Sequence, residues 1–322
     1  MDMEIEDTED KKTLQEVTSR SSSGPPHDAI FLVLSRLPLF ELLSMSLVCK
    51  SLKDALDDDI LLWLNIFVDK PLNFRVSDHI LMGITSKACG RLKSLALVDC
   101  LRITDAGLQA VIANNPLINK LYVPGCTSLT AEGIIRVVEM LDEHSHKPMR
   151  LKINGIYNIN SEHLDTIHDL IQLNQTQQKQ RKRMCHFYHN RHQYLLDFRE
   201  ENETNPDIDI DTCPKCSEVR MVFNCPDQKC RRKSEENLLS VCRGCQYCIP
   251  RCEECGRCVT NSEEQDDAEA ACNDILCMEC WLHLPKCNFC NKPYCKLHVQ
   301  QKHCLPESSG FLCEVCYSNF IQ

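Results

Sequence analysis

Residues 92–108 read LKSLALVDCLRITDAGL, and residues 118–134, 26 positions later, read INKLYVPGCTSLTAEGI. Eight positions keep their chemical class under this shift, and a looser third copy spans residues 151–164. Self-similarity at a period of about 20–50 residues indicates an array of stacked structural units. In each copy the alternation L-x-L predicts a short strand, and Thr104 or Thr130 can cap the helix that follows it.

The form L-x-x-L-x-L-x-x-C-x-x-I-T-x-x-G-L resembles the cysteine-containing type of leucine-rich repeat. The resemblance implies that the strands line a concave face, and a cysteine suits the tight turn after each strand. Cys100 and Cys126 are therefore expected to be structural. We assign the array to residues 69–170. Since three repeats are near the lower limit for such an array, the chain beyond Ile167 must cover its second end.

Residues 25–68 read PPHDAIFLVLSRLPLFELLSMSLVCKSLKDALDDDILLWLNIFV. Apolar residues recur at helical spacing on both sides of Pro38, which separates a first helix from a second. Asp59 precedes a third apolar run that ends at Trp63. From the residues alone, this segment is a small bundle whose leucines form a core.

The same segment resembles the F-box, the module that docks substrate receptors onto the Skp-type adaptor of SCF (Skp–cullin–F-box) ubiquitin ligases. Pro25 and Leu52 depart from the usual pattern, which has a leucine and often a tryptophan there. The resemblance implies that these residues contact the adaptor: Pro26, Ile30, Leu34, Leu37, Pro38, Leu42, Leu43, Val48, Cys49, Lys50 and Trp63.

Two charged segments flank these regions. Residues 1–24 hold seven acidic and three basic residues and few large apolar ones, so we predict a disordered tail. Residues 171–211 are predicted to be a charged linker. Its basic run at 179–192 is interpreted as a solvated segment, with a nuclear localisation signal as the alternative. Three histidines beside Cys185 leave a metal site there open.

Cysteine dominates the remainder, residues 212–322. Of the 24 cysteines in the chain, 19 lie between Cys213 and Cys316. The acidic amino terminus predicts no secretory signal, so a reducing compartment and bound metal are favoured over disulfides. Paired C-x2-C spacings direct two thiolates at one ion, and two pairs complete the tetrahedral set that zinc prefers.

We predict four or five zinc ions. Sequence leaves the pairing open between a cross-braced and a sequential scheme. The cross-braced scheme groups Cys277 and Cys280 with Cys295 and His298, and Cys287 and Cys290 with Cys313 and Cys316. The predicted ligands are Cys213, Cys216, Cys225, Cys230, Cys242, Cys245, Cys248, Cys252, Cys255, Cys258, Cys272, Cys277, Cys280, Cys287, Cys290, Cys295, His298, Cys313 and Cys316.

Composition argues against several classes of protein. A catalytic zinc site keeps an open position and uses more histidine or carboxylate, whereas these ligands are overwhelmingly thiolates. A net charge of −10 has the wrong sign for a nucleic-acid binder, and residues 213–322 hold 15 acidic and 13 basic residues. No apolar run approaches the roughly twenty residues that a membrane helix needs.

The predicted fold class is α + α/β: a helical F-box, a short leucine-rich array and a zinc-stabilised module. The F-box resemblance implies a non-catalytic substrate-recognition subunit of an SCF ubiquitin ligase. It would bind a Skp-type adaptor, and a cullin complex through it, and hold a protein substrate of unknown identity. The alternatives are a RING-like zinc ligase acting directly and a zinc-dependent transcription regulator. We expect a nuclear or cytoplasmic location, or both.

Overall fold

The computed structural model describes residues 29–144, 149–172, 186–191, 193–199, 208–228, 230, 242–259, 267–305 and 310–321. Within these ranges, no helix combines the length and apolar character needed to span a membrane. Several predictions fall outside them: the acidic tail, the adaptor contact at Pro26, most of the basic run at 179–192, and the contributions of Cys185 and His192 to a metal site.

The amino-terminal helices follow the predicted breaks. Pro38 immediately precedes the second helix, and the Asp59 side chain accepts a hydrogen bond from the Leu61 backbone N–H at 2.9 Å, which starts the last turn. The Trp63 side chain is 1% exposed and donates to the Leu56 carbonyl at 2.8 Å, so it ties the bundle together. The elements are α1 (Ala29–Leu34), α2 (Leu39–Met45), α3 (Lys50–Asp58) and the 3-10 turn η1 (Ile60–Trp63).

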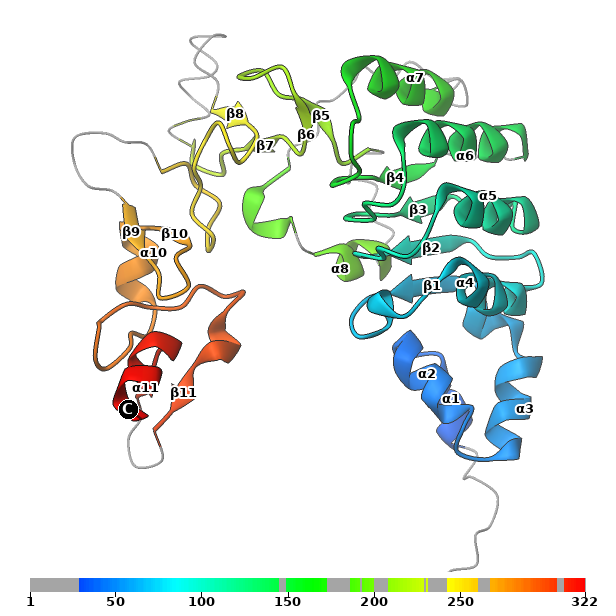
Figure 1. Ribbon diagram of the computed structural model, residues 1–322, viewed down its shortest axis with the longest axis horizontal. Coiled ribbons are helices and arrows are strands. Elements are labelled where there is room, and N and C mark those ends of the chain that lie inside the picture. The colour runs from blue at the N-terminus through cyan, green and yellow to red at the C-terminus, as the bar shows by residue number, and fades with distance from the viewer. Residues whose placement is uncertain are drawn as a thin grey trace, which may run out of the picture.

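A four-stranded parallel sheet follows, in the order β1-β2-β3-β4, with one helix after each strand (Figure 1). The strands are β1 (Asn65–Val68), β2 (Ser94–Leu97), β3 (Lys120–Tyr122) and β4 (Arg150–Lys152). The helices are α4 (Asp78–Thr85), α5 (Asp105–Asn114), α6 (Ala131–His144) and α7 (Ser161–Gln172), with the turns η2 (Leu72–Phe74) and η3 (Ser86–Ala88). The array therefore has four strand–helix units, beginning at Asn65 rather than at the predicted residue 69.

Adjacent units are joined by the same carboxylate–threonine contact. Asp78 accepts from the backbone N–H and hydroxyl of Thr104 at 2.9 and 2.7 Å, and Asp105 accepts from those of Thr130 at 3.0 and 2.6 Å. The predicted helix capping is present, because the Thr104 hydroxyl accepts from the Gly107 N–H at 3.3 Å. A Cβ at Gly107 would lie 2.1 Å from the Asp78 carboxylate, so this unit-to-unit contact requires glycine there.

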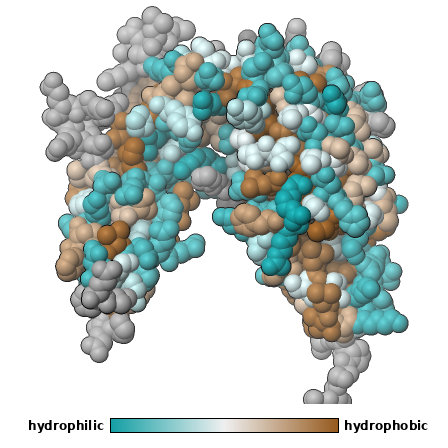
Figure 2. Space-filling view, viewed as in Figure 1, coloured by the Kyte–Doolittle hydropathy of each residue, from teal (hydrophilic) through white to brown (hydrophobic). Residues whose placement is uncertain are grey.

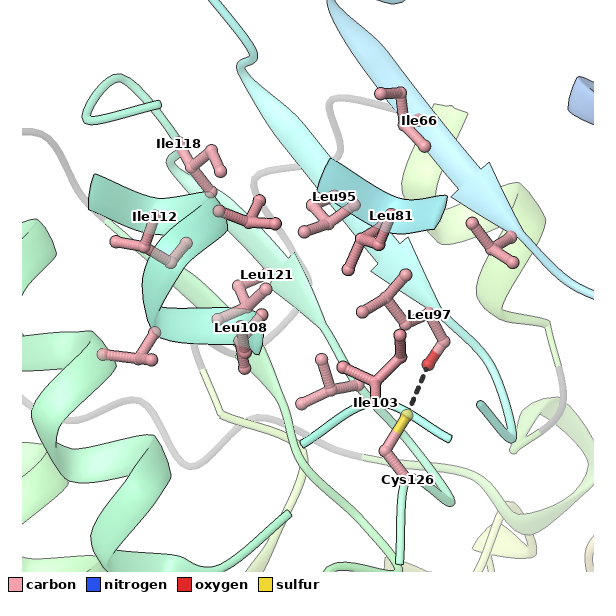
Figure 3. Close-up of a cluster of buried hydrophobic side chains, with 14 of the residues drawn as sticks. Ile66, Leu81, Leu95, Leu97, Ile103, Leu108, Ile112, Ile118, Leu121 and Cys126 are labelled. Carbon is pink, nitrogen blue, oxygen red and sulfur yellow. Dashed lines mark hydrogen bonds between the residues drawn. The ribbon is translucent and has the colours of Figure 1, made fainter. Parts of the chain in front are cut away.

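One hydrophobic core runs from the amino-terminal helices through all four units. Figure 3 shows part of this core, including side chains from Ile66 to Cys126. Leu95 and Leu121 occupy equivalent positions in neighbouring strands, and both are fully buried. Cys100 and Cys126 are also fully buried, and the Cys126 thiol donates to the Leu97 carbonyl at 3.2 Å. The two repeat cysteines therefore have the structural place that the sequence predicted for them.

A segment at residues 208–210 covers the open edge of the sheet beyond β4. Ile208 pairs in parallel with Leu151, and Ile208 and Ile210 join the shared core. Asp209, only 2% exposed, accepts hydrogen bonds from the backbone N–H groups of Ile153 at 2.8 Å and Asn154 at 3.4 Å. This short stretch supplies the cap that the array needs, within a region that the sequence predicted to be a linker.

Burial raises the pKa of Asp209 to about 6, although the two backbone donors and Lys152 oppose the shift. A raised carboxyl pKa contributes stability that is present below the unfolded pKa and is lost as pH rises through the folded value. We expect the stability difference between the wild type and Asp209→Asn to shift by about 1 kcal/mol in favour of the wild type between pH 7 and pH 5. Denaturant unfolding of both proteins at each pH measures it, and the titration of groups common to both proteins cancels in the difference. A constant difference would contradict the raised pKa.

Helix α8 (Tyr194–Arg199) lies on the strand face of the sheet opposite α4–α7 (Figure 1). Its Phe198 is 7% exposed, with its ring centroid 5.3 Å from that of Phe67 and 5.8 Å from that of Tyr122. Lys120 donates to the Phe198 carbonyl at 3.3 Å. Part of the strand face of the sheet is thus covered by the chain's own helix.

The described part of the cysteine-rich region contains short antiparallel strand pairs and short helices. The pairs are β5 (Asp211–Thr212) with β6 (Val219–Arg220), β7 (Phe223–Asn224) with β8 (Arg243–Gly244), β9 (Asp267–Glu269) with β10 (Ile275–Cys277), and β11 (His303–Cys304) with β12 (Phe311–Leu312). The helices are α10 (Met278–His283) and α11 (Glu314–Ile321), and 3-10 turns lie at η4 (Tyr188–Asn190) and η6 (Val299–Gln301). The buried clusters of this region each hold five or fewer residues, too few to stabilise it without further cross-links.

The η4 segment, also inside the predicted linker, is packed against the cysteine-rich region. The Tyr188 hydroxyl donates to Glu253 at 2.7 Å, and Arg191 forms an ion pair with the same carboxylate at 2.6 Å. The array and the cysteine-rich region form the two sides of an arch, and the space between them is open in the space-filling view (Figures 1 and 2).

Candidate functional site

One backbone knuckle is built three times in the cysteine-rich region. In each, the residue after a C-x2-C pair donates its N–H to the carbonyl of the first cysteine, at 2.8–3.0 Å for Ser217, Gly256 and Asn291. Each of these three residues has a left-handed backbone, with φ between 57° and 74°. The turn aims both thiols to the same side, which is the arrangement that a shared metal ion needs.

The described residues contain five groups whose ligand atoms all lie within 4.8 Å of one another. Four groups are made of cysteine alone and one is mixed. They are Cys213, Cys216, Cys245 and Cys248; Cys225, Cys230, Cys242 and Cys258; Cys252, Cys255, Cys277 and Cys280; Cys287, Cys290, Cys313 and Cys316; and Cys272, Asp274, Cys295 and His298. Every one of the 19 predicted ligands falls in one of these groups.

The sulfur spacing within the cysteine groups matches a tetrahedral ion. A metal–sulfur bond of about 2.3 Å gives tetrahedral sulfur–sulfur edges of about 3.8 Å. The Sγ–Sγ distances are 3.9 Å for Cys216–Cys245, 3.7 Å for Cys255–Cys277 and 3.7 Å for Cys290–Cys313. In the second group, Cys258 lies 3.8 Å from Cys225 and 3.6 Å from Cys230. The donor sets are therefore positioned and shaped for metal binding.

Backbone donors prepare individual thiols for the charged state that binds metal. Burial alone would raise the pKa of Cys213, but N–H donors led by that of Cys245, at 3.3 Å, lower it to about 6. The same balance lowers the pKa of Cys287 to about 6, where the Cys313 N–H donates at 3.2 Å. Such donors to ligand sulfurs orient the ligands and favour the thiolate.

The cross-braced pairing is right for one of its two groups. Cys287, Cys290, Cys313 and Cys316 lie together, whereas the other predicted group is wrong. Cys277 and Cys280 instead join Cys252 and Cys255 from an earlier knuckle, while Cys295 and His298 join Cys272. The reason is that β10 pairs with β9 and brings Cys277 back toward residues 252–255, where the Glu253 N–H donates to the Ile275 carbonyl.

Sequence reasoning missed one residue, Asp274. Its Oδ2 lies 3.0 Å from Cys295 Sγ, 3.2 Å from Cys272 Sγ and 2.9 Å from His298 Nδ1. One signal could have found it: 19 predicted ligands fill four groups of four and leave three over, so a fifth group needs a residue that is not a cysteine. The C-x-D spacing from Cys272 points to the nearest carboxylate.

The second candidate site is an apolar surface on the F-box helices. Six large apolar side chains there are exposed: Leu32 (80%), Val33 (52%), Phe40 (46%), Leu47 (87%), Val48 (68%) and Leu61 (73%). We call this set the F-box apolar surface, and Figure 2 shows hydrophobic residues gathered at this end of the molecule. Exposed apolar residues gathered in this way are typical of a protein-binding site.

The predicted adaptor contacts divide between surface and core. Val48, Pro38 and Lys50 are exposed, and Ile30, Leu37, Leu43 and Cys49 are half-buried. Leu34, Leu42 and Trp63 are at most 4% exposed and pack in the shared core, so they lie beneath the exposed surface rather than on it. Helical spacing identified them as one apolar face, and in the structure this face points into the core.

A cavity of about 660 Å³ lies where the F-box helices, the strands and α8 meet. Its lining includes the four basic residues Arg36, Lys93, Lys120 and Arg199, with Asp69 among them. Leu37 and Phe198 supply part of its apolar wall. The cavity shows that α8 spans from the sheet toward the F-box helices without filling the space between them.

Two regions of the chain match known protein families. Residues 26–64 match the family described as F-box domain, and residues 209–289 match the At3g27290 F-box protein C-terminal domain. The second match begins at the edge cap and includes three complete cysteine groups. Its description ties that part of the chain to F-box proteins.

Curated relatives extend the similarity over most of the length. The F-box protein SKIP28 of Arabidopsis thaliana is 40% identical over 299 residues, covering 90% of this chain and 90% of the relative. The F-box protein SKIP14 of the same plant is 36% identical over 81% of this chain and 55% of its own length. The F-box protein At3g27290, also of Arabidopsis thaliana, is 32% identical over 79% of this chain and 65% of its own. This chain belongs to the F-box protein family.

Proposed function

We propose that this protein is the substrate-recognition subunit of an SCF ubiquitin ligase, and that it performs no bond chemistry itself. The observation that carries the proposal is the F-box apolar surface, which lies within the part of the chain that matches the F-box domain. Docked there, a Skp-type adaptor would connect the chain to a cullin complex. Holding a substrate beside the charged conjugating enzyme raises the effective concentration of its lysines, and this requires binding alone.

We further propose that zinc occupies the four all-cysteine groups and stabilises the carboxy-terminal region. Tetrathiolate sets with sulfur–sulfur edges near 3.8 Å suit zinc, and four protein ligands leave no open position for catalysis. The ions would supply most of the folding free energy of a region whose apolar clusters are small. The array is interpreted as a leucine-rich repeat domain.

The cysteine-rich region is the better candidate for holding the substrate. Phe198 of α8 packs on the strand face of the array, which removes part of the surface that the repeats would offer. The cysteine-rich region exposes several large apolar side chains, among them Tyr247 (72%), Phe289 (77%), Val315 (63%) and Leu282 (59%). Metal cross-links would hold such side chains in place at low entropic cost to binding.

Two truncations test whether the cysteine-rich region, rather than the array, holds the substrate. Ending the chain at residue 211 removes every cysteine group but keeps Ile208, Asp209 and Ile210, whereas ending it at residue 204 also removes this edge cap. We expect the longer truncation to be soluble and to bind adaptor while losing its specific partners. We expect the shorter one to aggregate, because the β4 edge and its apolar neighbours become exposed. Affinity purification with mass spectrometry under proteasome inhibition measures both.

A chain ending at residue 211 that kept its substrates would return recognition to the array. Ubiquitin transfer by the purified protein with a conjugating enzyme, in the absence of adaptor and cullin, would instead favour the RING-like alternative. We propose a nuclear or cytoplasmic location, which imaging of a fluorescent fusion tests.

A further inference from the structure

We propose that Cys272, Asp274, Cys295 and His298 form a fifth zinc site that exchanges its ion much faster than the four all-cysteine groups. In this role the site holds two halves of the cysteine-rich region together while the ion is bound and frees them when the ion leaves. We call this site the clasp. The proposal rests on zinc binding by the other four groups. It adds a site with a different donor set and a different role.

The four side chains converge on one point. Asp274 Oδ2 lies within 3.2 Å of both sulfurs and of His298 Nδ1, and Cys295 Sγ lies 3.2 Å from His298 Nδ1. Two thiolates, one carboxylate and one imidazole bring a formal charge of −3, against −4 for four thiolates. Sulfur, nitrogen and oxygen in this mixture are all ligands that zinc accepts.

The donor set favours exchange at this site. Zinc is a borderline-soft ion, so replacing two thiolates by a carboxylate and an imidazole removes the softest ligands. The side chains of His298 and Asp274 are 37% and 27% exposed, so a chelator or competing thiol can reach the ion directly. Two of the all-cysteine groups also hold an exposed member, Cys216 or Cys290, so the expected difference in exchange rate rests on the ligands and not on exposure.

The group lies at the joint between the two halves of the cysteine-rich region, where one half meets the other. Its members alternate along the chain with those of two cysteine groups, because Cys272 precedes Cys277 and Cys280, while Cys295 lies between Cys290 and Cys313. Cys272 packs against both hydrophobic clusters on either side, one around Leu276 and the other around Phe311. The clasp therefore connects two separately cross-linked halves.

Among the described residues, the other contacts across this joint near the site are an exposed ion pair between Lys292 and Glu269 at 2.6 Å and several hydrogen bonds. The Ala271 N–H donates to the Pro293 carbonyl at 2.7 Å, and the Lys296 N–H donates to the Glu254 carboxylate. Lys296 Nζ also donates to the His189 carbonyl at 2.9 Å, which ties the knuckle at residues 295–298 to the η4 segment. Release of the ion should loosen the half that carries Phe289 and Val315, two of the exposed apolar residues.

The test measures zinc release from the full-length reduced protein with a metallochromic indicator during chelator competition. We expect one equivalent in a fast phase and four in a slow phase. The rates should differ by at least about tenfold, since even second-shell partners change metal affinity by about 10–100-fold. Hydrogen exchange after the fast phase should rise at residues 270–274 and 293–298, while residues 213–225 stay protected.

Three variants assign the fast phase. Asp274→Ala should bind four zinc ions and lack the fast phase, whereas Asp274→Cys should bind five and release all of them slowly. The matched control is Glu218→Ala, since Glu218 follows Cys216 at the same C-x-acid spacing and belongs to none of the five groups. The control should keep five ions and the fast phase. If Asp274→Ala does not fold, Asp274→Cys still decides.

Two results would overturn the clasp while leaving zinc binding intact: release of all ions in one phase by the wild type, or the same zinc content in the wild type and Asp274→Ala. A wild-type chain that binds no zinc under reducing conditions would instead remove the metal part of the proposed function. The two failures are therefore separable.

Discussion

Replacing Leu47 and Val48 together by aspartate should abolish co-purification with a Skp-type adaptor. Both side chains are exposed, at 87% and 68%, so the double variant should fold normally. In the complex, two unpaired carboxylates would be buried in an apolar contact, at a cost of several kcal/mol each. A loss of about 3 kcal/mol already weakens binding by more than about a hundredfold. Titration of purified adaptor against each chain measures the effect.

The control is Tyr157→Asp, which places a charge at an equally exposed apolar residue (74%) on the array. It should bind adaptor as the wild type does. This design is sharper than Leu37→Ala with Pro38→Ala, because Leu37 packs against the shared core and Pro38 precedes α2, so that pair would disturb folding as well as docking. A folded Leu47→Asp, Val48→Asp protein with undiminished affinity would exclude the F-box apolar surface as the docking site.

Removing metal should unfold the cysteine-rich region and leave the array intact. Structural zinc contributes about 10–16 kcal/mol per site in small domains, whereas the largest buried cluster of this region holds five residues. The array keeps a continuous core from the F-box helices to Ile210 that contains none of the metal groups. We expect chelator to abolish hydrogen-exchange protection at residues 213–316 and to preserve it at residues 65–144.

Chelator presaturated with zinc is the reagent control, and a pair of cysteine variants is the protein control. Cys252→Ser should lower the zinc content and destabilise the region, because Cys252 is fully buried within a four-cysteine group. Cys304→Ser should change neither, since Cys304 is exposed and lies outside all five groups. Retention of full protection after complete zinc removal would contradict the structural role of the metal.

The sequence predicted the array well where spacing was constant. Leu95 and Leu121 pair across β2 and β3 at the 26-residue shift that the repeat showed. The first unit escaped detection because Ile66 pairs with Leu95 at a distance of 29 residues, so a fixed shift places Asp69 where a leucine is expected. A loop that varies in length between units hides a repeat without altering the stacking of its strands.

The metal groups show a different limit. Cysteine is rare enough on surfaces for its spacing to identify nearly every ligand, whereas Asp274 is one of many acidic residues and carries no such signal. Pairing could not be predicted because it depends on which strands meet, as when β10 returns Cys277 to Cys252. The burial of some predicted adaptor contacts has a related reason: helical spacing reveals an apolar face without revealing whether it faces the core, as Leu34 does, or the solvent, as Leu47 does.

The continuous core has a mechanical consequence for ubiquitin transfer. Bending the F-box helices against the array would expose side chains such as Leu52, Trp63 and Ile66, each at most 2% exposed. The F-box helices and the array should therefore move as one rigid body, and thermal bending should be confined to the cysteine-rich side of the arch. In the proposed complex, the length and shape of this rigid body would then set the distance and angle between adaptor and substrate. The modified lysines of the substrate would be those that the conjugating enzyme can reach. Inserting a fifth strand–helix unit should therefore move modification to different lysines of the same substrate.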